Sequence, residues 1–235
     1  MAGRELKFVC SPCSDRRVIS NLIGRCSPDE KYQTNQVNSI YFDTHNWIFA
    51  DEKAASDYLK TKVRVRWYSD FSAGYLPQQI DEEENAGAVF LEIKKKIGST
   101  RDKVRKQLPL RASQLLASVN SIETAELIRS EIKKIDPELG CADLFPRILV
   151  QYRRRRFVDP LTRSRIAYDS NIRGYAIGRA PVERFSVFLM QSVLEVKGAE
   201  YELPMNLRFL NTVSFKKTAF SKYYECYCGL TGYHQ

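Results

Sequence analysis

The stretch KVRVRWY at residues 62–68 alternates basic and apolar side chains along its length. Such a period of two is typical of a β-strand, because successive side chains of a strand point to opposite faces of the sheet. Lys62, Arg64 and Arg66 therefore share one face, and the residues between them share the other. We expect the apolar face, which also carries Trp67, to lie in the hydrophobic core.

Further stretches of the chain show the same alternation of charged and apolar residues. The clearest are residues 89–94, 147–154 and 193–197, and shorter candidate strands are residues 4–9, 38–43, 103–110 and 163–169. Helical periodicity is confined to residues 14–23, 113–135, 204–213 and 217–228. Because most strands follow one another without an intervening helix, we expect an α+β fold dominated by an antiparallel sheet.

The charged side chains predicted to share one face of this sheet are mostly basic. The cations are Lys62, Arg64, Arg66, Lys94, Arg154, Arg165 and Lys197, and the carboxylates are Glu92 and Glu195. An open sheet with one hydrated face would explain the alternation. Like charges opposite one another destabilise a sheet, however, so this face favours a bound polyanion. If the sheet closes into a barrel with this basic face inside, its apolar outer face must be covered by helices, and the chain supplies several.

Composition is consistent with one globular domain over residues 1–235. The chain is 43% hydrophobic and carries 37 Lys and Arg against 28 Asp and Glu, a formal net charge of +9. That excess favours a polyanionic partner such as nucleic acid, anionic lipid or polyphosphate. No apolar run approaches the roughly 20 residues of a membrane helix, so we expect a cytoplasmic protein without a membrane segment.

Common catalytic and metal-binding motifs are missing from the sequence. It contains neither a GxxxxGK[ST] nor a GxGxxG pattern, and it has two histidines, His45 and His234. Six cysteines include the pairs Cys10 with Cys13 and Cys226 with Cys228. These pairs would form a zinc site only if the chain termini meet, and we expect reduced thiols instead. The acidic stretch 78–87 is interpreted as a solvated hairpin loop.

Many cations with two carboxylates suit phosphoryl transfer. That reaction requires neutralisation of spread negative charge and alignment of the reacting oxygens, which Arg and Lys side chains provide. A divalent cation such as Mn²⁺ or Mg²⁺ is bound by one or two carboxylates together with substrate phosphates. Glu195 and Glu92 are therefore candidate metal ligands.

These stretches, taken in order, resemble the VTC domain, the catalytic module of polyphosphate polymerases within the triphosphate tunnel metalloenzymes. The matching segments are SIYFD at 39–43, KVRVRWY at 62–68, VFLEIK at 89–94, YRR at 152–154, RIAYD at 165–169, VLEVK at 193–197 and FSK at 220–222. The resemblance implies a closed antiparallel tunnel that transfers the γ-phosphate of ATP to a growing polyphosphate chain. ATP, inorganic polyphosphate and a divalent metal are the partners it implies, and nucleic acid is not among them.

The resemblance also assigns roles to individual side chains. It implies that Glu195 binds the metal and that the following residues bind phosphate: Lys7, Arg64, Arg66, Lys94, Arg154, Arg165 and Lys222. We add Lys62, Tyr152, Lys197 and Ser221 as candidate substrate contacts. Strand 103–110 should contribute another cation, and its alternation favours Arg105 with Lys106 as the alternative.

One departure from the wider superfamily bears on the reaction. The hydrolytic and cyclase branches carry Glu-x-Glu-x-Lys on the first strand, whereas this chain has GRELK at residues 3–7 and lacks the first carboxylate. A tunnel triphosphatase is thus a second hypothesis, and a non-catalytic domain that binds polyphosphate or RNA is a third. Because the sequence contains neither a sensor domain nor membrane segments, we expect a free-standing version whose membrane partner, if it has one, is a separate chain.

Overall fold

The computed structural model describes residues 4–11, 14–55, 58–70, 87–178, 186–199 and 202–233. Its core is one antiparallel sheet of eleven strands, with the order β11-β1-β10-β8-β7-β3-β4-β5-β6, β2 paired with β7 and β9 paired with β8. The strands are β1 (Arg4–Cys10), β2 (Ser27–Pro28), β3 (Thr34–Asp43), β4 (Leu59–Ser69), β5 (Ala88–Ile97), β6 (Thr100–Arg111), β7 (Phe145–Val158), β8 (Arg165–Ala176), β9 (Ser186–Leu189), β10 (Ser192–Gly198) and β11 (Lys216–Lys217).

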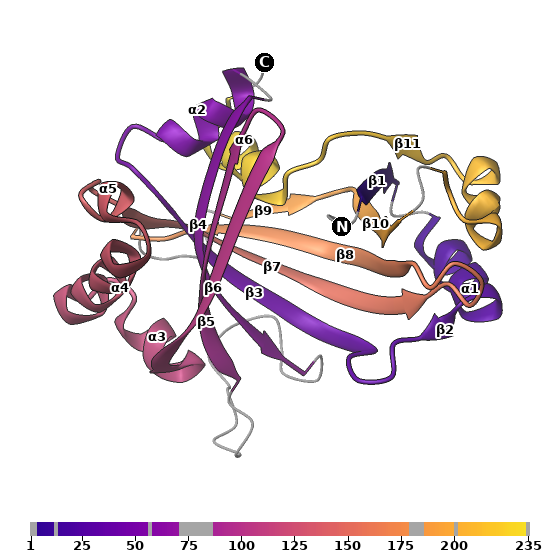
Figure 1. Ribbon diagram of the computed structural model, residues 1–235, viewed down its shortest axis with the longest axis horizontal. Coiled ribbons are helices and arrows are strands. Elements are labelled where there is room, and N and C mark those ends of the chain that lie inside the picture. Colours follow the sequence, from indigo (N-terminus) through magenta and orange to yellow (C-terminus); the bar gives the residue numbers. More distant parts are fainter. Residues whose placement is uncertain are drawn as a thin grey trace.

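The sheet is strongly twisted, and β4, β5 and β6 cross the direction of β7 and β8 (Figure 1). It does not close into a tunnel: in the described part of the chain, β6 and β11 are the two ends of the strand order. Closure would require β6 to pair with β11 or with the edge of β1 that β11 leaves uncovered, and the described strands show no such pairing. Strand β11 covers β1 at two residues, Phe8 opposite Lys217 and Val9 opposite Lys216. The predicted closed tunnel is therefore wrong, whereas the predicted antiparallel sheet with flanking helices is confirmed.

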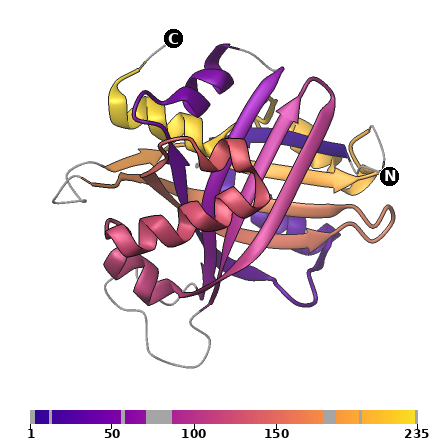
Figure 2. The same cartoon turned by 60° about the vertical axis from the view of Figure 1, so that its left-hand side comes forward.

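One set of helices covers the outer face of β3 to β6. It comprises α3 (Ala112–Ser118), α4 (Ile122–Ile135) and α5 (Pro137–Gly140), which lie across these strands in Figure 2. Leu115 and Ile128 from these helices share a buried cluster with Val63, Val65 and Trp67 of β4. The apolar face predicted from residues 62–68, including Trp67, is therefore the core face.

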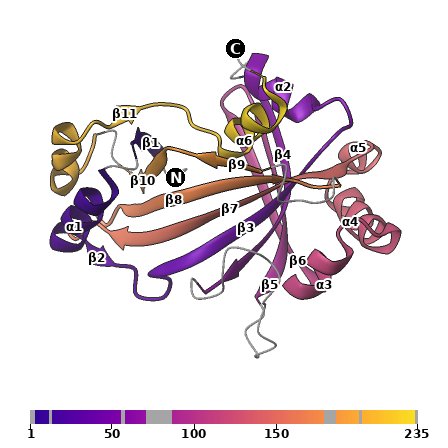
Figure 3. The same ribbon diagram turned by 180° about the vertical axis from the view of Figure 1, so that it is seen from behind.

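A second set covers the other end of the outer face. Helix α1 (Asp15–Arg25) and the 3-10 helix η3 (Met205–Thr212) pack against β1, β8 and β10. Val18, Leu22 and Leu207 meet Leu194 in this buried cluster. From behind, β3, β7 and β8 run between α1 at one end and α3 to α5 at the other (Figure 3).

The inner face is covered at one end by α2 (Ile48–Ala55) and α6 (Lys222–Thr231). Asp43 joins them, because its carboxylate accepts hydrogen bonds from the backbone N–H of Phe49 at 3.0 Å and from the Tyr223 hydroxyl at 2.5 Å. Helix α6 approaches β8 so closely that a Cβ on Gly174 would lie 2.7 Å from the Cys226 Sγ. This packing fixes the start of α6, where Lys222 lies.

Several predicted elements differ in extent from those observed. The helix expected at 113–135 is two helices, because Ser121 caps α4 by accepting a hydrogen bond from the Thr124 backbone N–H. The helix expected at 217–228 begins at Lys222, and residues 216–217 form β11 instead. Helix α2 and strand β9 were not predicted. The acidic stretch lies outside the described residues except for Gly87, as does Cys13, although β4 and β5 do pair as antiparallel neighbours.

Candidate functional site

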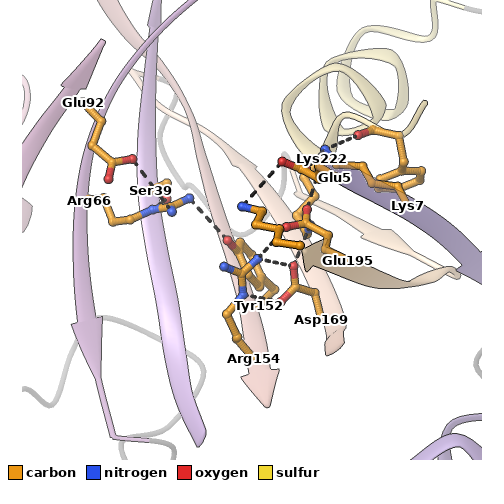
Figure 4. Close-up of polar contacts among 12 residues, drawn as sticks. Glu5, Lys7, Ser39, Arg66, Glu92, Tyr152, Arg154, Asp169, Glu195 and Lys222 are labelled. Atoms are coloured by element: carbon orange, nitrogen blue, oxygen red, sulfur yellow. Dashed lines mark hydrogen bonds and ion pairs between the residues drawn. The ribbon is translucent and has the colours of Figure 1, made fainter. Parts of the chain in front are cut away.

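The site lies on the inner face of the sheet, where strand register sets the basic and acidic side chains beside one another. Arg64 is opposite Tyr41 on β3 and Glu92 on β5, and Arg66 is opposite Ser39. Lys7 of β1 is opposite Glu195 of β10. Figure 4 shows Arg66 extending from β4 toward Tyr152, next to which Arg154, Asp169, Glu195 and Lys222 lie close together.

Glu92 is the centre of a cationic cluster at the β4 to β6 end. Its Oε2 lies 2.8 Å from Arg64 Nε and 2.5 Å from Arg64 Nη2, and its Oε1 lies 3.8 Å from Lys103 Nζ and 3.7 Å from Arg105 Nε. Burial alone would raise the pKa of Glu92, but the charges of Arg64 and Arg66 lower it to about 2. Glu92 is thus ionised at every physiological pH and fixes the Arg64 guanidinium.

Polar neighbours hold the two guanidinium groups of β4 in place. Arg64 Nη1 donates to the Tyr41 hydroxyl at 2.9 Å, and Arg66 Nε donates to Ser39 Oγ at 2.9 Å. Arg66 Nη2 also donates to the Tyr152 hydroxyl at 3.3 Å. Both arginines are buried, so these contacts position their forks before any ligand arrives.

A second ionic cluster lies on β7, β8 and β10. Arg154 Nε and Nη2 each donate to Asp169 at 2.6 Å, and Lys222 Nζ lies 2.7 Å from Asp169 Oδ2. Glu195 is held less closely, with 3.5 Å to Arg154 Nη2, 3.6 Å to Lys222 Nζ and 3.7 Å to Lys7 Nζ. Burial opposes the charge of Lys222, yet the two carboxylates raise its pKa above the ordinary value.

The sequence interpretation did not select Asp169 as a site residue. Its side chain is fully buried and joins the two cations that face Glu195. The signal was present, because Asp169 is in the RIAYD segment and has the parity of Arg165 on the same strand. The alternation of residues along the strand predicts which face of the sheet carries Asp169, but it does not predict that Asp169 contacts Arg154 and Lys222.

Lys222 lies in the first turn of α6, where its positive charge is stabilised by Asp169 and Glu195. Ser221 is the N-cap of this helix and accepts a hydrogen bond from the Tyr224 backbone N–H. Ser221 Oγ also accepts from Lys62 Nζ at 2.9 Å, which ties β4 to α6. A cation at a helix N-terminus opposes the helix dipole, so Asp169 and Glu195 must offset that cost.

Two lysines show how crowded the positive charge is. Burial, followed by the charges of Lys7 and Arg64, lowers the pKa of Lys62 to about 7. Burial and Arg64 lower the pKa of Lys94 to about 8, and Lys197 contributes in the same direction. Since Lys7 and Lys197 belong to β1 and β10, the two halves of the open sheet face each other across the site.

The remaining predicted residues occupy different positions on this face. Arg105 lies beside Glu92, whereas Lys106 pairs with Glu131 of α4 on the outer face, so Arg105 has the expected orientation. Lys197 Nζ is 3.5 Å from Glu5 Oε2. Arg165 is exposed at the start of β8, where it lies opposite Lys197 of β10.

A divalent metal fits Glu195 better than Glu92. In the residues that the structure describes, no three His, Cys, Asp or Glu side chains converge as metal ligands, so phosphate oxygens would have to complete the coordination. Cations surround both carboxylates, but Glu92 Oε2 also accepts hydrogen bonds from Arg64 at 2.8 and 2.5 Å, which occupy that oxygen. In the described part of the chain, the ionic contacts of the Glu195 carboxylate are 3.5 Å or longer, which leaves its oxygens more available than Glu92 Oε2.

The fold of this chain is similar to that of a solved structure with low sequence identity. The chain superimposes on the crystal structure of a "putative adenylate cyclase" from Bacillus halodurans with a TM-score of 0.54 and 13% identity, covering 94% of each chain. A second "putative adenylate cyclase", from Vibrio parahaemolyticus, has a TM-score of 0.41 at 9% identity, covering 99% of this chain and 88% of the other. No curated protein matches the chain.

The family is given by the sequence as a whole. The model of the VTC domain matches residues 3–231, and the chain therefore belongs to the VTC domain family. Membership supports a triphosphate-related function for the site on the inner face. None of the helices in the described ranges is long and apolar enough to cross a membrane.

Proposed function

We propose that this chain is a polyphosphate polymerase that transfers the γ-phosphate of ATP to the end of an inorganic polyphosphate chain. The observation that carries the proposal is that Arg64 and Arg66 of β4 lie on the same face of the sheet as Arg154 and Lys222, which are next to Glu195. Figure 4 shows Arg66, Arg154, Lys222 and Glu195 of this group. In each turnover a terminal oxygen of the polyphosphate bonds to the γ-phosphorus. The bond from that phosphorus to the β–γ bridging oxygen breaks, and ADP leaves.

The side chains divide this work by position. The guanidinium groups of Arg64, Arg66 and Arg154 neutralise and orient phosphate oxygens, for which their planar forks are suited. Lys222 supplies a further charge from the start of α6. Glu195 holds Mn²⁺ or Mg²⁺ together with the substrate phosphates, and that metal supplies additional neutralisation of charge when bound.

The proposed supporting contacts lie around this centre. Lys7, Lys62, Lys94, Arg105 and Lys197 extend the positive face and bind more distant phosphates. Tyr152 and Ser221 position Arg66 and Lys62 through the hydrogen bonds described above. Arg165, which is exposed, contributes to binding only where the chain leaves the site.

Purified protein incubated with ATP and Mn²⁺ or Mg²⁺ tests the proposal. A polymerase produces ADP and phosphate chains of increasing length, which gel electrophoresis resolves and an exopolyphosphatase digests. Release of free orthophosphate from ATP or tripolyphosphate without chain growth would identify a triphosphatase instead. Binding of tripolyphosphate without turnover would identify a non-catalytic module. A variant with Lys133→Ala, an exposed residue of α4, serves as a control for nonspecific charge effects.

A further inference from the structure

Lys62 and Ser221 form a side-chain pair whose chemistry the proposed transfer between phosphates does not use. Lys62 Nζ lies 2.9 Å from Ser221 Oγ, although the two residues are 159 positions apart in the chain. A base removes the proton of a serine hydroxyl across a hydrogen bond of about 2.6–3.2 Å. The pair therefore has the spacing of a nucleophile and its general base.

Lys62 differs in its partners from the other lysines near this helix. Lys7 and Lys222 lie 3.7 and 3.6 Å from Glu195 Oε1, so each has a carboxylate neighbour. In the part of the chain that the structure describes, the polar contact of Lys62 is instead the neutral hydroxyl of Ser221.

The surroundings of Lys62 favour its neutral amine. The charges that act on it most strongly are all positive and belong to Lys7, Arg64, Lys60 and Lys53, and Lys94 lies directly opposite on β5. Burial, followed by these charges, lowers the pKa of Lys62 to about 7. A substantial fraction of Lys62 is thus unprotonated near neutral pH and has a lone pair that accepts a proton.

The hydroxyl of Ser221 is held in place by the start of α6. Ser221 is the N-cap of this helix, and its Oγ accepts a hydrogen bond from the Tyr224 backbone N–H at 3.4 Å. The residue is 5% exposed, so bulk water has little access to it. A serine hydroxyl that accepts one hydrogen bond still donates its own proton, and a neutral Lys62 Nζ accepts it.

The two neighbours of Ser221 in the chain place it beside the proposed metal and phosphate site. Lys222 follows it and reaches Glu195. Phe220 precedes it, and its backbone carbonyl accepts a hydrogen bond at 3.5 Å from Lys7 Nζ, which also reaches Glu195. Lys7, Lys222 and Glu195 lie close together in Figure 4. A γ-phosphate bound beside Glu195 would therefore have the Ser221 hydroxyl as a neighbour.

We propose that Ser221 is itself a phosphoryl acceptor, with Lys62 as its general base. Ser221 Oγ bonds to the γ-phosphorus of ATP, the bond from that phosphorus to the β–γ bridging oxygen breaks, and ADP leaves. The hydroxyl proton passes to Lys62 Nζ and from there to water. The proposal rests on the proposed function, which supplies ATP at this site, and adds a first acceptor for use before any polyphosphate end is bound.

The phosphoserine formed in this step is matched by its surroundings. A phosphate group at a helix N-terminus accepts hydrogen bonds from backbone N–H groups and is stabilised by the helix dipole. Lys62, protonated by the reaction, lies next to the new phosphate, and Lys7 and Lys222 add further positive charge. The product is therefore more favourably placed here than on an exposed serine.

A merely structural role for the pair predicts different behaviour of conservative variants. A hydrogen bond that only ties β4 to α6 requires a donor at position 62 and an acceptor at position 221. Lys62→Arg keeps the donor and the charge but is not a base at physiological pH. Ser221→Asn keeps an N-cap side chain without a hydroxyl, whereas Ser221→Thr keeps both the cap and the nucleophile.

Radiolabelled ATP and Mn²⁺, without added polyphosphate, test the proposal on the purified full chain. After denaturation and digestion with an exopolyphosphatase, the covalent label is counted and located by mass spectrometry of peptides. Wild type and Ser221→Thr should carry phosphate at position 221, Ser221→Asn should not, and Lys62→Arg should acquire the label about a hundredfold more slowly. Ser130→Ala, which removes an exposed hydroxyl from α4, is the matched control and should be labelled like wild type.

The outcomes separate this proposal from the proposed function. If wild type converts ATP into ADP and phosphate chains but has no phosphate on Ser221, self-phosphorylation is refuted and the polymerase stands. Labelling of Lys62→Arg at the wild-type rate would refute the role of Lys62 as the base. Melting curves check that each variant folds, and peptide mapping of wild type decides the acceptor even where a variant does not fold. If wild type forms neither ADP nor label, the proposed function fails and this proposal with it.

Discussion

Asp169→Asn removes the carboxylate that joins Arg154 and Lys222, and the structure predicts a large loss of stability. The Asp169 side chain is fully buried and accepts two hydrogen bonds of 2.6 Å from Arg154, with Lys222 Nζ at 2.7 Å. Asparagine preserves the shape but leaves two buried cations side by side. Glu195, at 3.5 Å and 3.6 Å, compensates only in part.

The expected magnitude follows from the cost of a buried charge that has lost its partner. Removing one member of a buried ion pair costs about 3–5 kcal/mol, and the remaining contact with Glu195 places this case near 3 kcal/mol. For a domain of this size each 1 kcal/mol changes the melting temperature by about 2–4 °C, so a decrease of roughly 6–12 °C is expected. Lys222→Met in the same chain should recover part of that loss, because the second stranded charge is gone.

Thermal unfolding followed by circular dichroism measures both effects, and tripolyphosphate supplies a further comparison. A ligand that binds only the folded state stabilises it by mass action, and the Asp169→Asn site offers it cations that no carboxylate occupies. The gain in melting temperature at saturating ligand should therefore be larger in the variant than in wild type. The expected cost near 3 kcal/mol requires a clear fall in melting temperature. If the ligand-free variant melts less than about 2 °C below wild type, the ion pairs have been misassigned.

Three further expectations concern the site. At about 100 times its dissociation constant tripolyphosphate should stabilise wild type by roughly 2.7 kcal/mol. Arg64→Ala should reduce the resulting shift in melting temperature while Lys133→Ala does not, and equal shifts in both would mean mere screening of surface charge. Glu195→Gln should abolish metal-dependent formation of ADP with little change in the circular dichroism spectrum; wild-type activity at equal Mn²⁺ would disprove the ligand role. Because folding lowers the pKa of Lys62 to about 7 and of Lys94 to about 8, the unfolded chain binds more protons above those values. The free protein should therefore gain stability from these groups between about pH 7 and pH 10, while its affinity for tripolyphosphate decreases over the same range. Melting curves with and without ligand at pH 7 and 9 measure both trends. If the lysines have ordinary pKa values, the opposite trends will be missing.

Strand faces were predictable from the sequence because a period of two leaves a local signal. Val63, Val65 and Trp67 are buried under α3 and α4, as their alternation with Arg64 and Arg66 indicated. Helix α4 was recognised by its apolar periodicity, although the break at Ser121 was not. These features depend on neighbours in the chain, which sequence patterns report directly.

Sheet closure and the pairing of charges were not predictable in the same way. Whether the sheet closes depends on whether the two ends of the strand order, β6 and β11, come together, and these strands are far apart in the chain. The partners of Arg154 depend on register between β7 and β8, where a shift occurs between Gln151 and Arg153. Periodicity assigns a charge to a face but does not say which opposite charge lies next to it.

The ion pairs of the inner face bear on how the site binds its ligand. Arg64 is neutralised by Glu92, and Arg154 and Lys222 by Asp169, so the deepest cations have carboxylate partners in the ligand-free protein. A phosphate that binds these cations must share them with the carboxylates, so each contact contributes less binding free energy. The same carboxylates hold the cationic side chains in a fixed orientation before the ligand binds. Under the proposed function, cations that are already oriented in this way would favour alignment of the reacting groups.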